Sequence, residues 1–253
     1  MSRASGLAGR IAFVTGAGGG IGSAVVNLLR EEGARVVATD LQAPMLSGDD
    51  VWAESLDVSD GAAVDALVDL IERDWGPIDF GVSVAGVLGT DTVIETSDAE
   101  WRRIFAVNTD GVFHLGRALA RHMSQRRRGS FVTVGSNAAG VPRHAMAAYA
   151  ASKAAAHMFT RCLGLELAPL GIRCNIVAPG STLTPMQTGM WADESGAASV
   201  IAGQPQAFKS GIPLGKLATP EDIAETVAFL LSDRAGHITM ADIYVDGGAT
   251  LKA

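Results

Sequence analysis

Short apolar runs alternate along the chain with longer segments of helical periodicity. Because the apolar runs lack polar alternation, they are typical of strands buried on both faces, which indicates a parallel sheet. They are rich in Val, Ile or Phe, end at Gly, Asp or Ser, and cover residues 10–16, 35–40, 80–86, 130–136, 173–180 and 243–248. The helical segments between them cover about residues 20–32, 60–74, 98–123, 147–168 and 220–231.

This repeated alternation of strand and helix predicts one α/β domain over residues 1–253, a doubly wound (Rossmann-like) parallel sheet flanked by helices. Two helix starts are explicit in the sequence. Residues 97–100 read as a capping box, and Pro220 follows Thr219 with acidic residues in the first turn. Residues 181–211 carry weak strand and helix signals, which suits either a flexible cover over a substrate site or a plain surface excursion.

Composition and charge argue against nucleic acid, membranes and metal ions as binding partners. The net charge of −7 argues against nucleic acid or an anionic membrane. No apolar run reaches the roughly 18 residues of a membrane span, and residues 1–10 lack the apolar core of a signal peptide. Cys162 and Cys174 show no metal spacing and the five histidines form no cluster. We therefore expect no metal site and a reduced, cytoplasmic location. The basic block 126–128 is expected to be a solvated helix end.

A glycine-rich loop joins the first predicted strand to the first predicted helix. Gly16, Gly20 and Gly22 fit the spacing T-G-x-x-x-G-x-G, whereas the strict G-x-G-x-x-G pattern would need a glycine at Ile21. Glycines permit a tight turn, and the helix N-terminus that follows offers free N–H groups to a pyrophosphate. The loop therefore indicates a dinucleotide site.

An acidic residue ends the second predicted strand and bears on the choice of dinucleotide. Asp40 lies near the offset at which a carboxylate accepts hydrogen bonds from the adenosine ribose. An acid there repels a 2′-phosphate, and neither Ala17 nor Leu41 supplies a cation to bind one, so NAD is expected rather than NADP. Asp57 has two open roles, as an acceptor for the adenine amine or as a cap at the entry to the next helix.

The sequence also places a phenol beside an ammonium group. Tyr149 and Lys153 lie four residues apart in an alanine-rich run, so a helix would put both on one face. The pair is either an ordinary surface contact or a base with its stabilising cation. A tyrosine pKa near 10 would have to fall to about 7 for work near neutral pH, which requires about 4 kcal/mol of stabilisation. A cation one helical turn away has the right sign to contribute it.

With these residues in register, the chain resembles the short-chain dehydrogenase/reductase family along essentially its whole length. Ser136 and Tyr149 are separated by the 13 positions typical of that family. The matching elements are TGAGGGIG at 15–22, Asp40, Ala85-Gly86, Asn108, Ser136, YAASK at 149–153 and PGSTLT at 179–184.

The resemblance implies catalytic roles for Ser136, Tyr149, Lys153 and Asn108. Tyr149 would take the proton from a substrate hydroxyl as hydride leaves the carbon, and Ser136 would hold that hydroxyl. Lys153 would also bind the nicotinamide ribose, Asn108 would fix a proton-relaying water, and Thr184 would bind the carboxamide. The implied cofactor-binding residues are Gly16, Gly20, Ile21, Gly22, Asp40, Asp57, Val58, Ala85, Gly86, Tyr149, Lys153, Pro179, Gly180, Thr182 and Thr184.

Within the family, stretches such as 132–143 and 208–224 most resemble dehydrogenases of 2,3-dihydro-2,3-dihydroxybenzoate. That resemblance implies NAD-dependent oxidation of the ring C3 hydroxyl of a cyclohexadiene carboxylic acid to aromatic 2,3-dihydroxybenzoate, in siderophore or secondary-metabolite biosynthesis. It also implies a homotetramer. Arg143 is the candidate partner of the carboxylate, with a solvent-facing arginine as the alternative. The implied substrate contacts are Ser136, Arg143, Tyr149, Gln187 and Met190. Met190 and Trp191 have an alternative role, in which they pack against the protein without contacting the substrate.

Several positions depart from the pattern of these dehydrogenases and keep other substrates open. They are Gly89 in place of arginine, Leu183 and Pro185 in place of acids, and His144 in place of an apolar residue. Ser83 stands where the wider family usually has asparagine, and cofactor binding is expected to survive that change. One alternative reaction converts 2,3-dihydro-3-hydroxyanthranilate to 3-hydroxyanthranilate. Another is oxidation of a simple secondary alcohol or reduction of a ketone. A non-catalytic NAD-binding protein is a third alternative.

Overall fold

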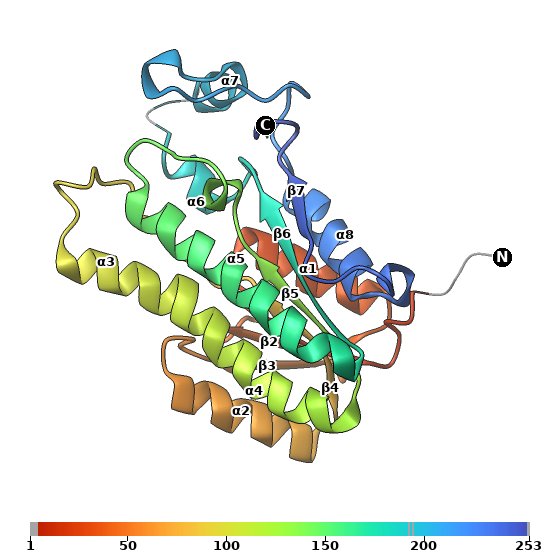
Figure 1. Cartoon of the computed structure of the whole chain (residues 1–253). Coiled ribbons are helices and arrows are strands. Elements are labelled where there is room, and N and C mark those ends of the chain that lie inside the picture. Colours follow the sequence, from red (N-terminus) through yellow and green to blue (C-terminus); the bar gives the residue numbers. More distant parts are fainter. Residues whose placement is uncertain (1–4, 192, 194, 252–253) are drawn as a thin grey trace.

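Seven parallel strands form one continuous sheet at the centre of the molecule (Figure 1). The computed structural model describes residues 5–191, 193 and 195–251. The strand order is β3-β2-β1-β4-β5-β6-β7. The chain therefore adds β2 and β3 on one side of β1 and then crosses over to add β4 to β7 on the other side. The strands are β1 (Ile11–Thr15), β2 (Arg35–Asp40), β3 (Val51–Ser55), β4 (Ile78–Ser83), β5 (Gly129–Val134), β6 (Ile172–Pro179) and β7 (Asp242–Val245).

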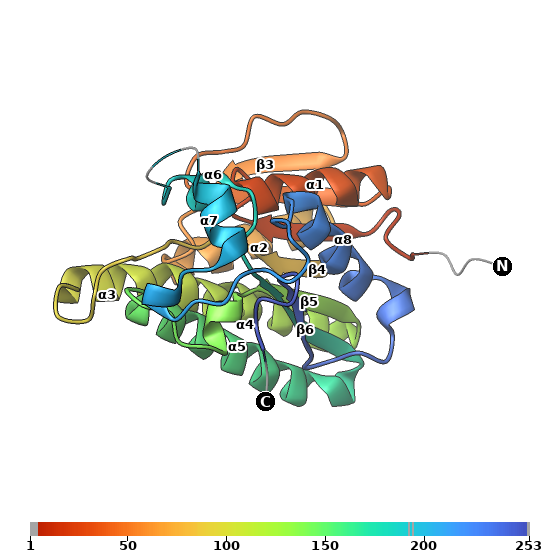
Figure 2. The same cartoon turned by 90° about the horizontal axis from the view of Figure 1, so that it is seen from above.

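Helices cover both faces of the sheet, which gives three layers (Figure 2). The long helices are α1 (Gly20–Glu31), α2 (Gly61–Asp74), α4 (Gly111–Arg126), α5 (Ala147–Leu167) and α8 (Pro220–Leu231). The shorter ones are α3 (Asp98–Phe105), α6 (Pro185–Thr188), α7 (Gly196–Ala202), the π-helical turn η1 (Ala106–Asp110), and the 3₁₀ turns η2 (Asn137–Ala139), η3 (Ala168–Leu170), η4 (Pro205–Ala207) and η5 (Asp233–Ala235).

Alternating side chains of the strands separate the core into two clusters. On β1, Ala12 and Val14 pack with α1 and α8, whereas Ile11 and Phe13 pack with α2, α4 and α5. This alternation is the pleat of a strand that is buried on both faces. The doubly wound prediction is therefore confirmed. Within the described residues, no helix is both long and apolar enough to cross a membrane.

The sequence did not reveal the edge strand β3, and it predicted the helix at 98–123 as continuous. β3 pairs with β2 alone, and its sequence VWAES ends on two polar residues, so it lacks the apolar run that marks the other strands. The long helix is interrupted by the π turn η1. Ser97 accepts the Glu100 N–H as expected, but the Glu100 carboxylate pairs with Arg103 instead of completing the capping box. Thr219 and Asp222 do form a complete box at the start of α8.

The basic block 126–128 lies at the C-terminal end of α4 with Arg127 and Arg128 exposed, as predicted, but its side chains also bind other parts of the protein. Arg126 donates to Glu72 (2.6 Å) and to the Ile78 carbonyl oxygen (2.8 Å), which joins α4 to α2 and β4. Arg128 forms an ion pair with Asp79 at the start of β4. Arg127 ends α4 in the left-handed conformation, with φ of 52°, and donates to the Pro169 carbonyl oxygen.

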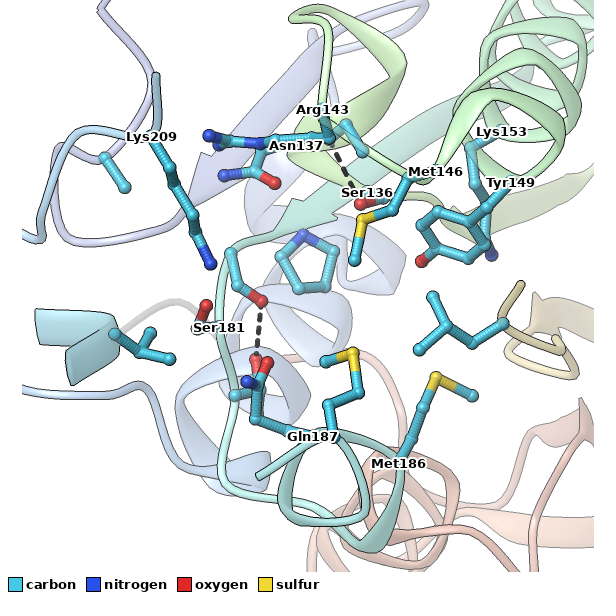
Figure 3. Close-up of a pocket in the computed structure, with 18 of the residues that line it drawn as sticks. Ser136, Asn137, Arg143, Met146, Tyr149, Lys153, Ser181, Met186, Gln187 and Lys209 are labelled. Atoms are coloured by element: carbon cyan, nitrogen blue, oxygen red, sulfur yellow. Dashed lines mark hydrogen bonds between the residues drawn. The ribbon is translucent and has the colours of Figure 1, made fainter. Parts of the chain in front are cut away.

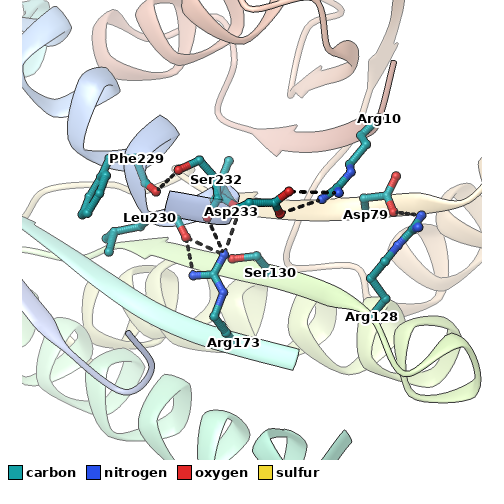
Figure 4. Close-up of polar contacts among 10 residues, drawn as sticks. Arg10, Asp79, Arg128, Ser130, Arg173, Phe229, Leu230, Ser232 and Asp233 are labelled. Carbon is teal, nitrogen blue, oxygen red and sulfur yellow. Dashed lines mark hydrogen bonds and ion pairs between the residues drawn. The ribbon is translucent and has the colours of Figure 1, made fainter. Parts of the chain in front are cut away.

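Arg173, on β6, binds the carbonyl end of α8 at the amino edge of the sheet (Figure 4). Its guanidinium donates to the carbonyl oxygens of Leu230 (2.6 Å), Leu231 (2.9 Å) and Ser232 (3.1 Å). Burial lowers the pKa of Arg173, yet an arginine remains charged at any physiological pH. A cation at this position complements the negative pole of the helix and satisfies carbonyl groups that have no partner within the helix.

Arg173→Met should lower the free energy of unfolding by about 2 to 3 kcal/mol, because three helix-terminal carbonyl groups lose a charged donor. Urea denaturation followed by circular dichroism measures this loss. Arg234→Met is the matched control, since Arg234 is exposed and its replacement should change stability by about 0.5 kcal/mol at most. Equal stabilities of the two variants would contradict this role of Arg173.

Candidate functional site

Two adjoining pockets lie at the carboxyl edge of the sheet. The first, here called the glycine-loop pocket, is lined by the loop between β1 and α1 and by the ends of β2 and β4. The second, the tyrosine pocket, is lined by the ends of β5 and β6, the start of α5 and the segment 181–211. The two share Ile21, Val84, Gly86, Thr184 and Met186. Ligands of doubly wound sheets bind at this edge, where the strand order reverses.

The glycines of the first loop are required by close backbone contacts. Gly16 has φ of +68°, and a Cβ there would lie 2.6 Å from the Ala85 backbone nitrogen. A Cβ on Gly22 would overlap the Gly16 carbonyl oxygen. No side chain caps the N-terminus of α1, whose N-cap residue is Gly19 and whose first turn holds no acid. The free N–H groups of this first turn therefore face the pocket with a positive dipole end, as a pyrophosphate site requires.

Asp40 lies at the end of β2 on the wall of the glycine-loop pocket. Its Oδ2 accepts the Gly18 N–H (2.9 Å) and its Oδ1 accepts the Leu41 N–H (2.8 Å). The carboxylate thus holds the glycine loop and also adds negative charge to the pocket. Asp57 lines the same pocket but is not the helix cap, because Asp60 accepts the first N–H groups of α2 while Asp57 accepts from Ser59.

Tyr149, Lys153 and Ser136 meet in the tyrosine pocket, and the first two lie one turn apart on α5 (Figure 3). Burial raises the pKa of Tyr149, and its hydrogen bond with Ser136 opposes that shift. Burial lowers the pKa of Lys153 to about 8. The Lys153 ammonium donates to the Val134 carbonyl oxygen (3.1 Å) and lies 5.9 Å from the centre of the Tyr149 ring. Lys153 is therefore mostly protonated at pH 7, next to the phenol.

Asn108 lies in the π turn η1, is fully buried and lines neither pocket. Its Oδ1 accepts the Val87 N–H (2.8 Å), and its Nδ2 donates to the Val87 carbonyl oxygen (2.9 Å) and to Ser152 Oγ (3.0 Å). A Cβ on Gly86 would lie 3.2 Å from Lys153 Nζ and 3.3 Å from Asn108 Oδ1. Gly86 therefore keeps open the small space between Lys153 and Asn108.

A buried polar network behind Ser136 was not predicted from the sequence. The Ser136 N–H donates to His157 Nε2 (3.3 Å), so the neutral ring carries its proton on Nδ1, which donates to Asp242 Oδ2 (3.2 Å). Burial alone would raise the pKa of Asp242, but hydrogen bonds from His157 and Arg161 hold it below its usual value. The backbone of Ser136 is thus anchored through α5 to β7.

The predicted residues are distributed over the two pockets, and the predicted cofactor residues Pro179, Gly180 and Thr182 line the tyrosine pocket. The glycine-loop pocket contains Gly16, Gly20, Ile21, Gly22, Asp40, Asp57, Val58, Ala85, Gly86 and Thr184. The tyrosine pocket contains Ser136, Arg143, Tyr149, Lys153, Pro179, Gly180, Thr182, Thr184, Gln187 and Met190. Trp191 is not among the lining residues, and its ring packs against Gly196. Lining residues that the sequence did not single out include Asn137, Met146, Met186 and Lys209.

The segment 181–211 forms one wall of the tyrosine pocket through residues from Ser181 to Ser210. It contains the short helices α6 and α7 and the turn η4, which its weak sequence signals did not reveal. The position agrees with a cover over the pocket, and its mobility stays a prediction.

Comparisons with known proteins give one consistent result. The model of a family described as "Enoyl-(Acyl carrier protein) reductase" matches residues 16–250. The chain is 55% identical, over 98% of both chains, to 2,3-dihydro-2,3-dihydroxybenzoate dehydrogenase of Bacillus subtilis. It is 44% identical to the vibriobactin-specific 2,3-dihydro-2,3-dihydroxybenzoate dehydrogenase of Vibrio cholerae, over 94% of this chain and 95% of that one. The structure superposes on ligand-free aldohexose dehydrogenase of Thermoplasma acidophilum with a TM-score of 0.88 and 29% identity, covering 99% and 98% of the two chains.

Burial of Lys153 should make the stability of the protein depend on pH. The folded-state pKa of about 8 lies below the ordinary lysine pKa of 10.5, so between these pH values the unfolded chain binds more protons than the folded one. Stability therefore rises with pH in this window. From pH 8 to 9.5, the unfolding free energy of wild type minus that of Lys153→Met should rise by about 1 to 2 kcal/mol. The unfolding free energy of wild type minus that of Lys216→Met, at an exposed site, should not change with pH over this range. If the difference for Lys153→Met did not change with pH either, the burial of a charged Lys153 would be contradicted.

Gly135→Ala should destabilise the protein by about 2 kcal/mol, because the added Cβ would overlap the His157 ring. The three nearest atoms to that Cβ all belong to His157. The same substitution should therefore cost much less in a His157→Ala background. A double-mutant cycle by urea denaturation measures the difference, and equal costs in both backgrounds would show that His157 does not lie against Gly135.

Proposed function

Because the chain belongs to the short-chain dehydrogenase/reductase family, we propose that it oxidises the C3 hydroxyl of 2,3-dihydro-2,3-dihydroxybenzoate with NAD. The product is 2,3-dihydroxybenzoate. The observation that carries this proposal is the tyrosine pocket itself, which is lined by Ser136 and Tyr149 and also by Arg143. The first pair handles a hydroxyl, and a guanidinium binds a carboxylate. A hydroxyl and a carboxylate are both present on 2,3-dihydro-2,3-dihydroxybenzoate, the compound in the names of the relatives from Bacillus subtilis and Vibrio cholerae.

Four side chains take part in the proton transfer in this proposal. Ser136 Oγ accepts the Ala138 N–H (3.1 Å), which fixes the hydroxyl beside Tyr149. Ser136 then donates to the oxygen of the substrate, while Tyr149 takes its proton. The protonated Lys153 stabilises the phenolate, since its pKa of about 8 keeps it charged at pH 7. Asn108, next to Lys153 across Gly86, would hold the water that accepts the proton afterwards.

The residues around the glycine-loop pocket fit a dinucleotide. Bound NAD would supply the hydride acceptor. The uncapped first turn of α1 would hold the pyrophosphate, and Asp40 the adenosine ribose. Asp40 favours NAD over NADP because a 2′-phosphate would approach a carboxylate whose nearest hydrogen-bond donors are backbone N–H groups. Thr184, which lines both pockets, would bind the carboxamide at their junction.

The chemistry of the ring makes oxidation favourable. Loss of hydride and a proton at C3 converts the secondary alcohol to a ketone, and tautomerisation of this ketone gives an aromatic catechol. The protein needs only to align the hydroxyl, take one proton and keep the carboxylate in place. This reaction belongs to the synthesis of catechol-containing compounds such as siderophores.

We propose further that the protein is a cytoplasmic homotetramer. Apolar side chains on the outer surfaces of α4 and α5 support association, since Phe113, Met158 and Leu165 are 39%, 55% and 66% exposed. Sedimentation measures the oligomeric state.

Absorbance at 340 nm tests the reaction directly, with 2,3-dihydro-2,3-dihydroxybenzoate and either NAD or NADP. We expect fast reduction of NAD, little of NADP, and loss of at least about 1,000-fold in kcat for Tyr149→Phe, which removes the base and leaves the ring in place. Unchanged turnover in Tyr149→Phe would contradict the mechanism. Turnover of 2,3-dihydro-3-hydroxyanthranilate alone, or of carboxylate-free alcohols as fast as the acid, would assign a different substrate.

A further inference from the structure

Lys209 occupies a fixed position at the end of the segment 181–211. The turn from Gln204 to Lys209 is closed by two backbone hydrogen bonds, from the Gln204 N–H to the Lys209 oxygen (2.9 Å) and from the Lys209 N–H to the Gln204 oxygen (3.1 Å). Phe208, within the turn, has φ of 51°. The backbone therefore determines where the Lys209 side chain begins, and that side chain lines the tyrosine pocket.

The side chain of Lys209 faces Arg143 from another part of the chain. Figure 3 shows Lys209 entering the pocket from the side opposite Tyr149, with Arg143 extending toward it. Burial lowers the pKa of Lys209, and the charge of Arg143 lowers it further. Burial also lowers the pKa of Arg143. The two cations are thus partly desolvated and repel each other across one end of the pocket.

Neither cation is neutralised within the described part of the chain. No salt bridge or hydrogen bond is formed there by the side chain of Arg143 or Lys209, although both are half-buried. The charge of Asp246 acts on Arg143, but its carboxylate accepts from Asn137 Nδ2 (3.3 Å) and from the Gly248 N–H (3.0 Å). Buried charges in proteins are normally paired, so two facing cations without a partner indicate an anionic ligand.

We propose that Lys209 and Arg143 together bind the carboxylate of the substrate, an inference that rests on the proposed function. Arg143 offers a planar pair of donors and Lys209 a compact charge from the opposite side. The carboxylate end of the ring is then held away from Tyr149 and Ser136, with the hydroxyl end toward them. Because Lys209 belongs to the cover segment and Arg143 to the loop before α5, the bound carboxylate joins the two walls of the pocket.

The other basic side chains of the pocket are less suited to this role. The Lys153 ammonium already donates to the Val134 carbonyl oxygen beside the phenol. His144 lines the pocket but is exposed. Specificity for a ring acid over the corresponding neutral ring is therefore assigned to Lys209 and Arg143.

Lys209→Gln tests this assignment in steady-state kinetics with NAD. We expect KM for 2,3-dihydro-2,3-dihydroxybenzoate to rise about 10- to 100-fold, the equivalent of one charged hydrogen bond, with kcat changed less than about threefold. The neutral cyclohexadiene diol that lacks the carboxylate should be oxidised equally by both proteins. Lys209→Arg should recover most of the affinity, since it keeps the charge. Lys216→Gln, at an exposed lysine, is the control and should behave as wild type. Equal KM values in Lys209→Gln and wild type would overturn the proposal.

Calorimetry with NAD-loaded protein separates this inference from the proposed function, because it needs no turnover. Wild type should bind 2,3-dihydroxybenzoate at least about 10-fold more tightly than catechol, and Lys209→Gln should lose that preference. If wild type oxidises no diol acid but shows this Lys209-dependent preference, the proposed reaction is wrong and the carboxylate site stands. If the preference is absent in wild type, or persists in Lys209→Gln, the carboxylate site is wrong. Unchanged NADH binding and melting temperature in Lys209→Gln show that the variant is folded.

Discussion

Parallel pairing of the seven strands is the constraint on which the rest of the structure depends. It brings the carboxyl ends of all strands to one edge, so that residues far apart in the chain meet there. The ends of β1, β2 and β4 contribute the glycine loop, Asp40 and Ala85, and the ends of β5 and β6 contribute Ser136 and Pro179. The reversal of strand order between β1 and β4 opens the edge at the junction of the two pockets.

Charged groups at the two edges of the sheet differ in whether they have partners within the protein. At the amino edge, charged groups are satisfied by the protein: Arg173 binds the end of α8, Arg128 pairs with Asp79, and Arg10 pairs with Asp233. At the carboxyl edge, the first turn of α1 has no side-chain cap, and the cations of the tyrosine pocket have no carboxylate partner among the described residues. Stability therefore comes chiefly from the amino edge and the core, while the carboxyl edge keeps groups free for ligands.

Local patterns in the sequence predicted much of this arrangement, because the relevant signals are local. Buried strands appear as unbroken apolar runs, and Ser136, Tyr149 and Lys153 have a characteristic spacing within one short stretch. The strand β3 was missed because its sequence, VWAES, ends on two polar residues and gives no unbroken apolar run. His157 and Asp242 are 85 positions apart, and Lys209 lies 66 positions from Arg143. Their partnership exists only after folding, so no spacing in the sequence could have revealed it.

Asp40 shows how closely ligand choice and backbone structure are connected in this protein. Its carboxylate accepts the Gly18 N–H at 2.9 Å, and a Cβ on Gly18 would lie only 3.1 Å from the same oxygen. The residue to which we assign the proposed preference for NAD therefore also shapes the glycine loop. An evolutionary or engineered change of coenzyme at this position must replace two functions at once, so acceptance of a phosphorylated ribose calls for a compensating change in the loop itself.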